Sequence, residues 1–223
     1  MKYIKKNSEP ADFIQWKQRA SDDWQPNWDN FQKPEKPIVL DALLLEQGHI
    51  CCYCGQRITQ ESSHVEHFKP RTAYPELKLD YQNFLASCPG YPEEDELKNN
   101  QSKPLHKSCG QFKGGWYDPD LTVSPLQPDC ASYFRYTGIG EIIASNDNAK
   151  SKAANATIVH LNLNYTKLQA SRRSAIDGVL EGIELLTSDE VQTLIDSYDR
   201  LDASGQYVKF HTTVIYILQQ FLT

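Results

Sequence analysis

The sequence predicts an α+β protein in which a small, metal-stapled core lies between two helical parts. Two cysteines at C-x-x-C spacing and two further cysteines mark the core, short extended segments lie near them, and helical periodicity dominates after residue 149. A length of 223 residues suits one domain of ordinary size, or a small core with appended helices. We predict a helical part over 1–48, the core over 49–145 and a second helical part over 146–223.

The composition is that of a globular protein. Hydrophobic residues make up 39% of the chain and charged residues 23%, which excludes collagen-like, coiled-coil and fully disordered classes. We find neither a run of about 18 apolar residues nor a signal-peptide pattern, so no membrane span is expected and the cytoplasm is the expected compartment. The formal net charge of −6 argues against a protein that covers nucleic acid with a basic surface. Phosphate contact is expected in the neutral middle third.

The first half of the chain contains two predicted helices and one predicted hairpin. A helix is expected over 9–20, then a connector rich in Pro and Trp, and a second helix over 38–47 that ends at Gly48. Residues 56–68 are interpreted as a hairpin with a polar turn. Residues 80–88 are interpreted as a loop that enters a helical turn, and 89–108 as a polar insertion.

The second half begins with a further hairpin and continues as helices. Alternating residues over 132–144 predict the hairpin, and helices are expected over 149–160, 166–186, 188–203 and 206–222. These helices carry no cluster of His, Cys or carboxylates at ligand spacing. The C-terminal part is therefore predicted to pack or to dock a partner and not to hold a second catalytic site.

The cysteines favour a structural metal site over disulfides, because the expected compartment keeps thiols reduced. Cys51 and Cys54, followed by a glycine, form a knuckle in which two thiolates grip one zinc ion, and Cys88 and Cys109 complete a tetrahedral set. Cys52 is too close to Cys54 to share the knuckle and is interpreted as a bystander. The alternative is four unrelated buried thiols.

A carboxylate stands directly before a histidine in the stretch H-V-E-H at 64–67. Neighbours on a strand point to opposite faces, so Glu66 can bind a divalent metal while His67, as a solvent-facing base, removes a proton from water. A Glu-His pair alone is more often a surface ion pair or a strand end. The surrounding cysteines favour the chemical interpretation. His64, on the same strand face as Glu66, is interpreted as a solvated histidine.

These motifs together resemble a known family. The segments that carry the resemblance are CCYCG at 51–55, EHFKPR at 66–71, DYQNFLASCPG at 80–90, CGQFKGG at 109–115 and LNLN at 161–164. The sequence resembles the HNH endonucleases. More narrowly, the order of the motifs over about residues 38–180 is similar to that of the PtuB-like HNH effectors of Septu and retron anti-phage systems.

The resemblance implies a ββα-metal core with a zinc knuckle and assigns roles by position. Glu66 matches the metal-binding acidic residue, His67 the general base and Asn83 the residue that orients the loop and the base. The structural Zn²⁺ ligands are Cys51, Cys54, Cys88 and Cys109, and the catalytic ion is Mg²⁺ or Mn²⁺. The third letter of the motif falls near Gly110, which has no side chain, so Gln111 is the expected substitute; His106 or a water molecule are alternatives. Lys113 and Lys107 are expected to contact the nucleic-acid backbone.

The predicted function is a metal-dependent HNH endonuclease that hydrolyses phosphodiester bonds. DNA is the favoured substrate, with RNA such as tRNA as an alternative, and the family implies a defence effector that acts with an ATPase partner. A second hypothesis is a zinc-stapled interaction module without catalysis. The two hypotheses differ at Glu66 and His67, which a binding module would not need.

Overall fold

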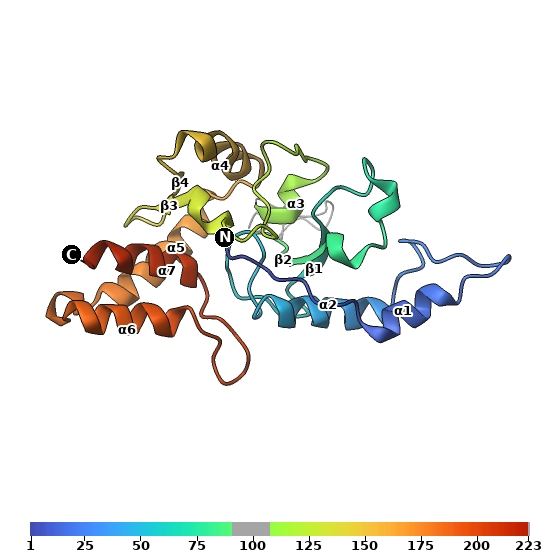
Figure 1. Ribbon diagram of the computed structural model, residues 1–223, viewed down its shortest axis with the longest axis horizontal. Coiled ribbons are helices and arrows are strands. Elements are labelled where there is room, and N and C mark those ends of the chain that lie inside the picture. The colour runs from blue at the N-terminus through green and yellow to red at the C-terminus, as the bar shows by residue number, and fades with distance from the viewer. Residues whose placement is uncertain (91–107, 223) are drawn as a thin grey trace, which may run out of the picture.

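Short strands and helices alternate along an elongated molecule in the computed structural model, which describes residues 1–90 and 108–222 (Figure 1). The helices are α1 (Ala11–Gln18), α2 (Glu35–Glu46), α3 (Cys109–Lys113), α4 (Asn148–His160), α5 (Thr166–Leu180), α6 (Ser188–Tyr198) and α7 (His211–Leu218), and the strands are β1 (His64–His67), β2 (Phe84–Ser87), β3 (Phe134–Tyr136) and β4 (Ile142–Ala144). The predicted α+β class is confirmed.

The N-terminal helices and their connector support the first sheet from one side. Phe13 of α1 lies 4.9 Å from Phe31 and 6.1 Å from Phe84 of β2, measured between ring centroids. Trp16 is 3% exposed, and Trp24 and Trp28 of the connector pack against the same cluster. The aromatic residues of this region therefore build core, and they bring the connector up to the sheet.

The predicted hairpin over 56–68 is wrong. β1 pairs antiparallel with β2, with His64 opposite Ser87 and His67 opposite Phe84, while Arg57 forms only an isolated bridge with Ile50. All four residues of β2 are buried, so the strand lacks the alternating pattern that distinguishes a strand from a helical turn. The expected helical turn is present as a short 3-10 helix, Tyr81–Asn83, directly before the strand.

The second predicted hairpin is confirmed, because β3 pairs antiparallel with β4. Its turn is fastened to α5 by the buried Arg172, whose Nε donates to the carbonyl of Gly140 at 2.7 Å and whose Nη2 donates to the carbonyl of Leu163 at 2.8 Å. Gly140 has a φ of +82°, and a Cβ there would lie 2.3 Å from the carbonyl oxygen of Gln169. Only glycine suits this close approach.

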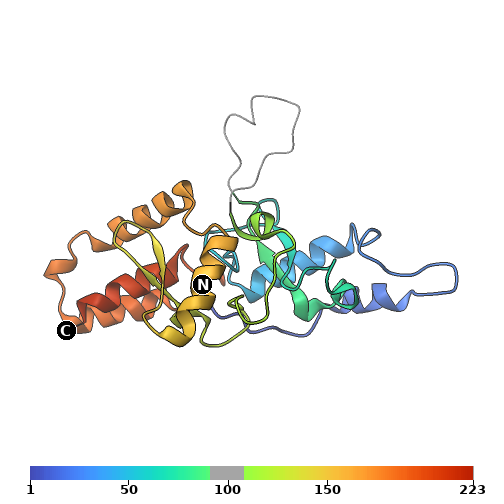
Figure 2. The same ribbon diagram turned by 90° about the horizontal axis from the view of Figure 1, so that it is seen from above.

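The C-terminal helices begin and end differently from the prediction. The helix expected over 166–186 ends at Leu180 and is followed by the short 3-10 helix Ile183–Leu185, and the last helix begins only at His211, after Phe210 in a left-handed conformation. Helices α5, α6 and α7 lie together at one end of the molecule (Figures 1 and 2) and share a small apolar cluster of Val179, Ile183, Val191, Ile195, Val214 and Leu218. None of the described helices has the length and apolar character needed to cross a bilayer.

One continuous apolar core joins the rest of the chain. It includes Ile4 near the N-terminus, Leu43 of α2, Phe84 of β2, Ile158 of α4 and Leu168 of α5. The N-terminal segment, the first sheet and the helices α4 and α5 therefore depend on each other's packing.

Candidate active site and metal centre

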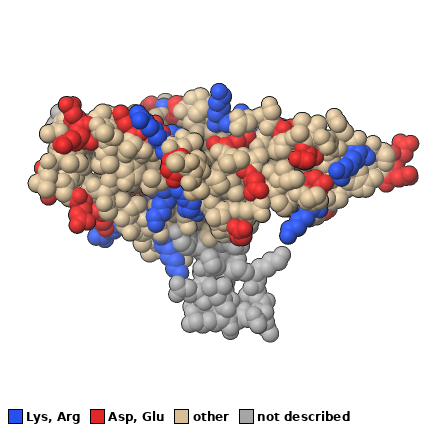
Figure 3. Space-filling model, turned by 90° about the horizontal axis from the view of Figure 1, so that it is seen from below, with Lys and Arg blue, Asp and Glu red and all other residues tan. Residues whose placement is uncertain are grey.

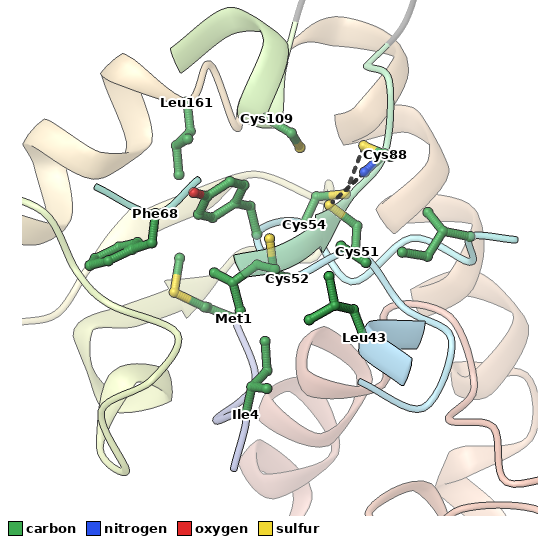
Figure 4. Close-up of a cluster of buried hydrophobic side chains, with 14 of the residues drawn as sticks. Met1, Ile4, Leu43, Cys51, Cys52, Cys54, Phe68, Cys88, Cys109 and Leu161 are labelled. Atoms are coloured by element: carbon green, nitrogen blue, oxygen red, sulfur yellow. Dashed lines mark hydrogen bonds between the residues drawn. The ribbon is translucent and has the colours of Figure 1, made fainter. Parts of the chain in front are cut away.

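Four cysteine side chains converge where α2, β2 and α3 meet. The Sγ atoms of Cys51, Cys54, Cys88 and Cys109 all lie within 4.8 Å of one another, and all four residues are buried (Figure 4). The first two lie in a tight turn in which the amide of Gly55 donates to the carbonyl of Cys51 at 3.1 Å and Gly55 has a φ of +76°. This cluster could hold one metal ion.

The distances within the cluster suit zinc. Four sulfurs about 2.3 Å from a tetrahedral zinc lie about 3.8 Å from each other. The Sγ atoms of Cys54 and Cys88 are 3.8 Å apart, and the amide of Cys88 donates to the Sγ of Cys51 at 3.3 Å. Burial would raise the pKa of Cys51, but hydrogen bonds from the surrounding thiols lower it well below its ordinary value, whereas hydrogen bonds within the cluster and burial raise the pKa values of Cys88 and Cys109 well above theirs. Four buried sulfurs at this spacing therefore fit the donor set of a zinc ion, which would deprotonate the remaining thiols on binding.

Cys52 and Cys130 lie outside the four-thiol group. Both are buried in the main core, and burial raises the pKa of each thiol, most strongly that of Cys52. Neutral buried thiols behave as small apolar side chains. Cys52 is thus a packing residue, as its spacing from Cys54 predicts.

Glu66 and His67 reach a common cavity of about 320 Å³, although they are neighbours on β1. The lining residues are Trp28, His64, Val65, Glu66, His67, Pro70, Arg71, Thr72, Gly110, Gln111, Gly114 and Gly115. The structure thus brings three of the predicted site residues, Glu66, His67 and Gln111, to one cavity. Because it is the candidate active site, we call it the catalytic cavity below.

The two carboxylate oxygens of Glu66 have different surroundings. Oε1 accepts hydrogen bonds from the Tyr53 hydroxyl at 3.1 Å and from the Lys113 Nζ at 2.7 Å, while Oε2 lies 3.6 Å from the Nε2 of His64. Burial would raise the pKa of Glu66, but the adjacent His64 and the Lys113 ammonium lower it below its usual value. Glu66 is therefore a buried, charged carboxylate with one oxygen engaged by the protein.

His67 is not the solvent-facing base that the sequence predicts. The residue is 9% exposed, and its ring packs against Trp28 at 4.4 Å and Phe84 at 5.1 Å between centroids. Its Nε2 lies 3.1 Å from the carbonyl oxygen of Lys78, which can only accept, so Nε2 carries the proton and Nδ1 the lone pair. Burial lowers the pKa of His67, which keeps the imidazole neutral at neutral pH.

Asn83 fastens the loop that follows β1 and does not line the catalytic cavity. Its Oδ1 accepts from the amide of Lys69 at 2.8 Å, and its Nδ2 donates to the carbonyl of the same residue at 2.9 Å. The same Nδ2 lies 3.5 Å from the carbonyl of Leu77, next to the residue whose carbonyl meets His67. Asn83 thus ties both ends of this loop to the start of β2.

Gly110 and Gln111 occupy the start of α3. A Cβ at position 110 would lie 2.5 Å from the Oε2 of Glu66 and 3.1 Å from the Oγ of Ser87, so no side chain can be accommodated there without moving the carboxylate. Gln111 is exposed and lines the catalytic cavity. The absence of a side chain at position 110 is therefore a requirement of how α3 packs against β1.

The prediction that Lys113 contacts nucleic acid is wrong, because its side chain is only 1% exposed. Its Nζ donates to the Oε1 of Glu66 at 2.7 Å and to the carbonyl of His67 at 3.0 Å. No local sequence signal indicates this contact, because Lys113 and Glu66 are 47 residues apart in the sequence. Lys107 lies outside the described residues.

Two curated proteins are similar to the chain. It is 33% identical over 150 residues to the "Retron Vc95 putative HNH endonuclease" of Vibrio cholerae serotype O1 biovar El Tor. The aligned region covers 65% of the chain and 66% of that protein. It is also 31% identical over 107 residues to the Septu protein PtuB of Bacillus thuringiensis, and this aligned region covers 47% of the chain and 41% of that protein. The chain thus spans just under two thirds of the first and less than half of the second. No protein-family model matches the chain.

The chain is a homologue of proteins of the HNH class. Within that class its relatives are those of the Septu and retron type, which confirms the resemblance carried by the sequence motifs. The name of the first relative supports the prediction of an endonuclease.

We expect the purified chain to contain about one tightly bound zinc ion, and Cys109→Ser to lose it. Structural zinc contributes on the order of 10 kcal/mol to small metal-dependent folds, so the variant should be poorly soluble or melt at a much lower temperature. Metal analysis by mass spectrometry and thermal melting test this. Cys130→Ala, a buried thiol outside the cluster, should keep its zinc. A folded, zinc-free wild-type protein would contradict the assignment.

Proposed function

We propose that the chain is a metal-dependent HNH endonuclease that hydrolyses phosphodiester bonds. Its ββα-metal core would consist of β1, β2 and α3 within residues 49–145, flanked by the helical parts 1–48 and 146–223. The observation that carries the proposal is the adjacent pair Glu66 and His67, which meets one cavity as a charged carboxylate and a neutral imidazole. Acid–base hydrolysis with a divalent ion needs these two states together.

The cavity offers oxygen donors to a divalent ion. Glu66 would hold Mg²⁺ or Mn²⁺ through Oε2, because its Oε1 is engaged by Tyr53 and Lys113. The amide of Gln111 at the same cavity is the further ligand suggested by the family pattern. When bound, such an ion stabilises negative charge on the phosphate and on the leaving oxygen.

His67 would act as the general base. The hydrogen bond from its Nε2 to the Lys78 carbonyl fixes the tautomer, so the lone pair of Nδ1 accepts the proton of the attacking water. Contacts with Trp28 and Phe84 hold the ring in one orientation. Asn83 would act as a positioning residue, because it ties down the loop that presents the Lys78 carbonyl.

Two cations beside His67 form a site for the phosphate backbone. Lys36 and Arg71 both lie over the ring of Trp28, at 4.7 and 5.2 Å from its centroid. Burial, and secondly the charge of Arg71, lowers the pKa of Lys36. Among residues 1–90 and 108–222 neither cation forms an ion pair with a carboxylate. A polyanion beside the general base would neutralise both.

The groove extends past the catalytic cavity. A second cavity of about 240 Å³ shares Trp28, Arg71 and Thr72 with the first, and Asn27, Asp29 and Lys78 complete its lining. An indole flanked by cations suits contact with sugar-phosphate or with an unstacked base. This groove replaces Lys113 as the proposed nucleic-acid contact, and Lys107 stays a proposal from the sequence.

DNA is the favoured substrate, and RNA such as tRNA is the alternative. On the face shown in Figure 3, acidic side chains lie at both ends of the long axis and charges of both signs are interspersed between them. Such a surface provides little unspecific affinity for a polyanion. A partner that holds the nucleic acid would supply the rest of the affinity.

The partner we propose is an ATPase subunit of a cytoplasmic anti-phage complex, with residues 146–223 as the docking part. The name of the Septu relative supports the defence context. Several large apolar side chains of this part are exposed, and Leu185, between α5 and α6, is 81% exposed. Deletion of the part is not a suitable test, because α4 and α5 supply Ile158 and Leu168 to the main core.

The second candidate function is a zinc-stapled interaction module without catalysis. The four buried cysteines would serve it equally well. It does not account for a neutral histidine beside a charged carboxylate at one cavity, which is why we favour the nuclease.

We expect His67→Gln to reduce cleavage by about 10² to 10⁴-fold, the usual effect of losing a positioned general base. The glutamine amide can still donate to the Lys78 carbonyl, so zinc content and melting temperature should stay close to wild type. His67→Ala would instead leave a gap between Trp28 and Phe84. The assay is cleavage of plasmid DNA and of total RNA with the partner present, with divalent metal added or chelated. Equal cleavage by wild type and His67→Gln would favour the interaction module.

We expect Arg71→Ala to weaken nucleic-acid binding and to reduce the slope of log K against log salt by about one, because one phosphate contact is lost. Fluorescence anisotropy with the slowly cleaving His67→Gln protein, without added divalent metal, measures both quantities. Arg200→Ala removes the same charge from an exposed position outside the groove and should leave both unchanged. Equal effects of the two substitutions would show a general charge effect.

We expect Leu185→Glu to prevent co-purification with the co-expressed ATPase while zinc content and melting temperature stay unchanged. Leu45→Glu is the matched control, since Leu45 on α2 is also an exposed aliphatic residue, 66% exposed, and lies outside the docking part. Normal assembly of the Leu185→Glu protein with the ATPase would show that Leu185 does not lie in the interface.

A further inference from the structure

We propose that His64 is a second protein ligand of the catalytic ion, so that a histidine and a carboxylate on one face of β1 hold the ion together. This inference rests on the proposed nuclease function and deepens it. It replaces the interpretation of His64 as a solvated strand histidine, and it makes the site one that prefers transition-metal ions to Mg²⁺.

The strand itself places the two side chains side by side. His64 and Glu66 are two residues apart on β1, so their side chains leave the same face. The Nε2 of His64 lies 3.6 Å from the Oε2 of Glu66. Nitrogen and oxygen ligands about 2.1 Å from one ion lie about 3.0–3.5 Å from each other. A small rotation of the imidazole is therefore enough to complete the pair.

The carboxylate is already oriented for this role. Tyr53 and Lys113 both bind Oε1, and both donors are buried, so the carboxylate cannot turn without losing two hydrogen bonds. Oε2 is left on the side of His64. A ligand that shares an ion with Glu66 has to approach from this side.

The start of α3 cannot supply the ligand at position 110. A Cβ there would overlap Oε2, at a distance of 2.5 Å. Gln111 is one residue further along the short helix and is exposed, so its amide has to reach back toward the carboxylate. His64 needs no such reach, since its Nε2 is already next to Oε2.

The imidazole of His64 is held by no competing hydrogen bond in the described part of the chain. Its Nδ1 is buried there without a hydrogen-bond partner, and its Nε2 is directed to Glu66. The side chain is 25% exposed, so an ion entering from the cavity meets it. The ring can therefore adjust its angle to an ion at little cost.

The ligand pair has a consequence for metal preference. Imidazole nitrogen is a good ligand for Ni²⁺ and Zn²⁺. Mn²⁺ favours oxygen ligands but accepts an imidazole more readily than Mg²⁺, which demands octahedral oxygen ligands and retains its water. A site made only of Glu66 and Gln111 would present oxygen donors alone and would accept Mg²⁺ as readily. The contribution of His64 to metal affinity should thus be large for Mn²⁺ and small for Mg²⁺.

The test measures metal binding and not cleavage. The zinc-loaded full chain is titrated with Mn²⁺, and free Mn²⁺ is read by electron paramagnetic resonance. We expect His64→Leu to raise the Kd for Mn²⁺ by about 10- to 100-fold, Glu66→Gln to raise it at least as much, and Gln111→Ala to change it by less than about threefold. His160→Leu, an exposed histidine outside the cavity, is the matched control and should have no effect. Zinc content and melting temperature show that each variant is folded.

A second measurement on the wild-type protein does not depend on any variant. Electron spin echo envelope modulation of the wild-type Mn²⁺ complex should show the ¹⁴N coupling of a directly bound imidazole. Absence of this coupling in a protein that binds Mn²⁺ would overturn the inference even if His64→Leu failed to fold.

The outcomes separate this inference from the proposed function. If Glu66→Gln weakens Mn²⁺ binding and His64→Leu does not, the inference is wrong and the metal site of the nuclease stands. If Gln111→Ala weakens Mn²⁺ binding and His64→Leu does not, the second ligand is the glutamine. If neither Glu66→Gln nor His64→Leu changes the Kd, the proposed catalytic metal site itself is wrong.

Discussion

The four-thiol cluster is the constraint on which the geometry of the candidate site depends. It joins the turn after α2, the end of β2 and the first residue of α3, three segments that are far apart in the sequence. Because Cys109 is the first residue of α3, the cluster also sets where the next turn of that helix lies. Gly110 then contacts the carboxylate of Glu66, and Lys113 lies beneath it. The four-thiol cluster therefore positions the residues around Glu66 in the candidate active site.

Some parts of this arrangement could be predicted from the sequence and others could not, depending on how distinctive the local residue pattern is. The cysteine set could be predicted because thiolate ligands have few other uses at such spacing, and a chemical role was predicted for the adjacent Glu66 and His67 because these cysteines surround them. The strand pairing was not, because β2 is buried on both faces and shows no alternation, so residues 56–68 were assigned to a hairpin. The start of α7 was missed because a left-handed Phe210, and no glycine or proline, marks the boundary, whereas the end of α5 was missed although a left-handed Gly182 follows it.

Burial was the quantity that the sequence could not supply, and it changed the interpretation of three side chains. Lys113 looks like a surface cation in a polar stretch, yet it is an internal partner of Glu66. His67 is covered by a tryptophan from the N-terminal connector, a segment without periodicity that nothing in the sequence links to the strand. His64 looks solvated, yet one of its nitrogens is buried. For Lys113 and His67 the neighbour comes from a part of the chain remote in sequence, which a local pattern does not contain.

The pleat of β1 explains how two adjacent residues acquire opposite electrostatic properties. On one face Glu66 meets an ammonium, a hydroxyl and an imidazole, all of which favour the ionised carboxylate. On the other face His67 meets two aromatic rings and a carbonyl, which favour the neutral imidazole with its lone pair on Nδ1. The environments differ because the first face is built by the elements that the cysteine cluster joins and the second by the N-terminal aromatic cluster. The helical N-terminal part is therefore a component of the candidate site, since without Trp28 the ring of His67 would lose both its orientation and part of the burial that keeps it neutral.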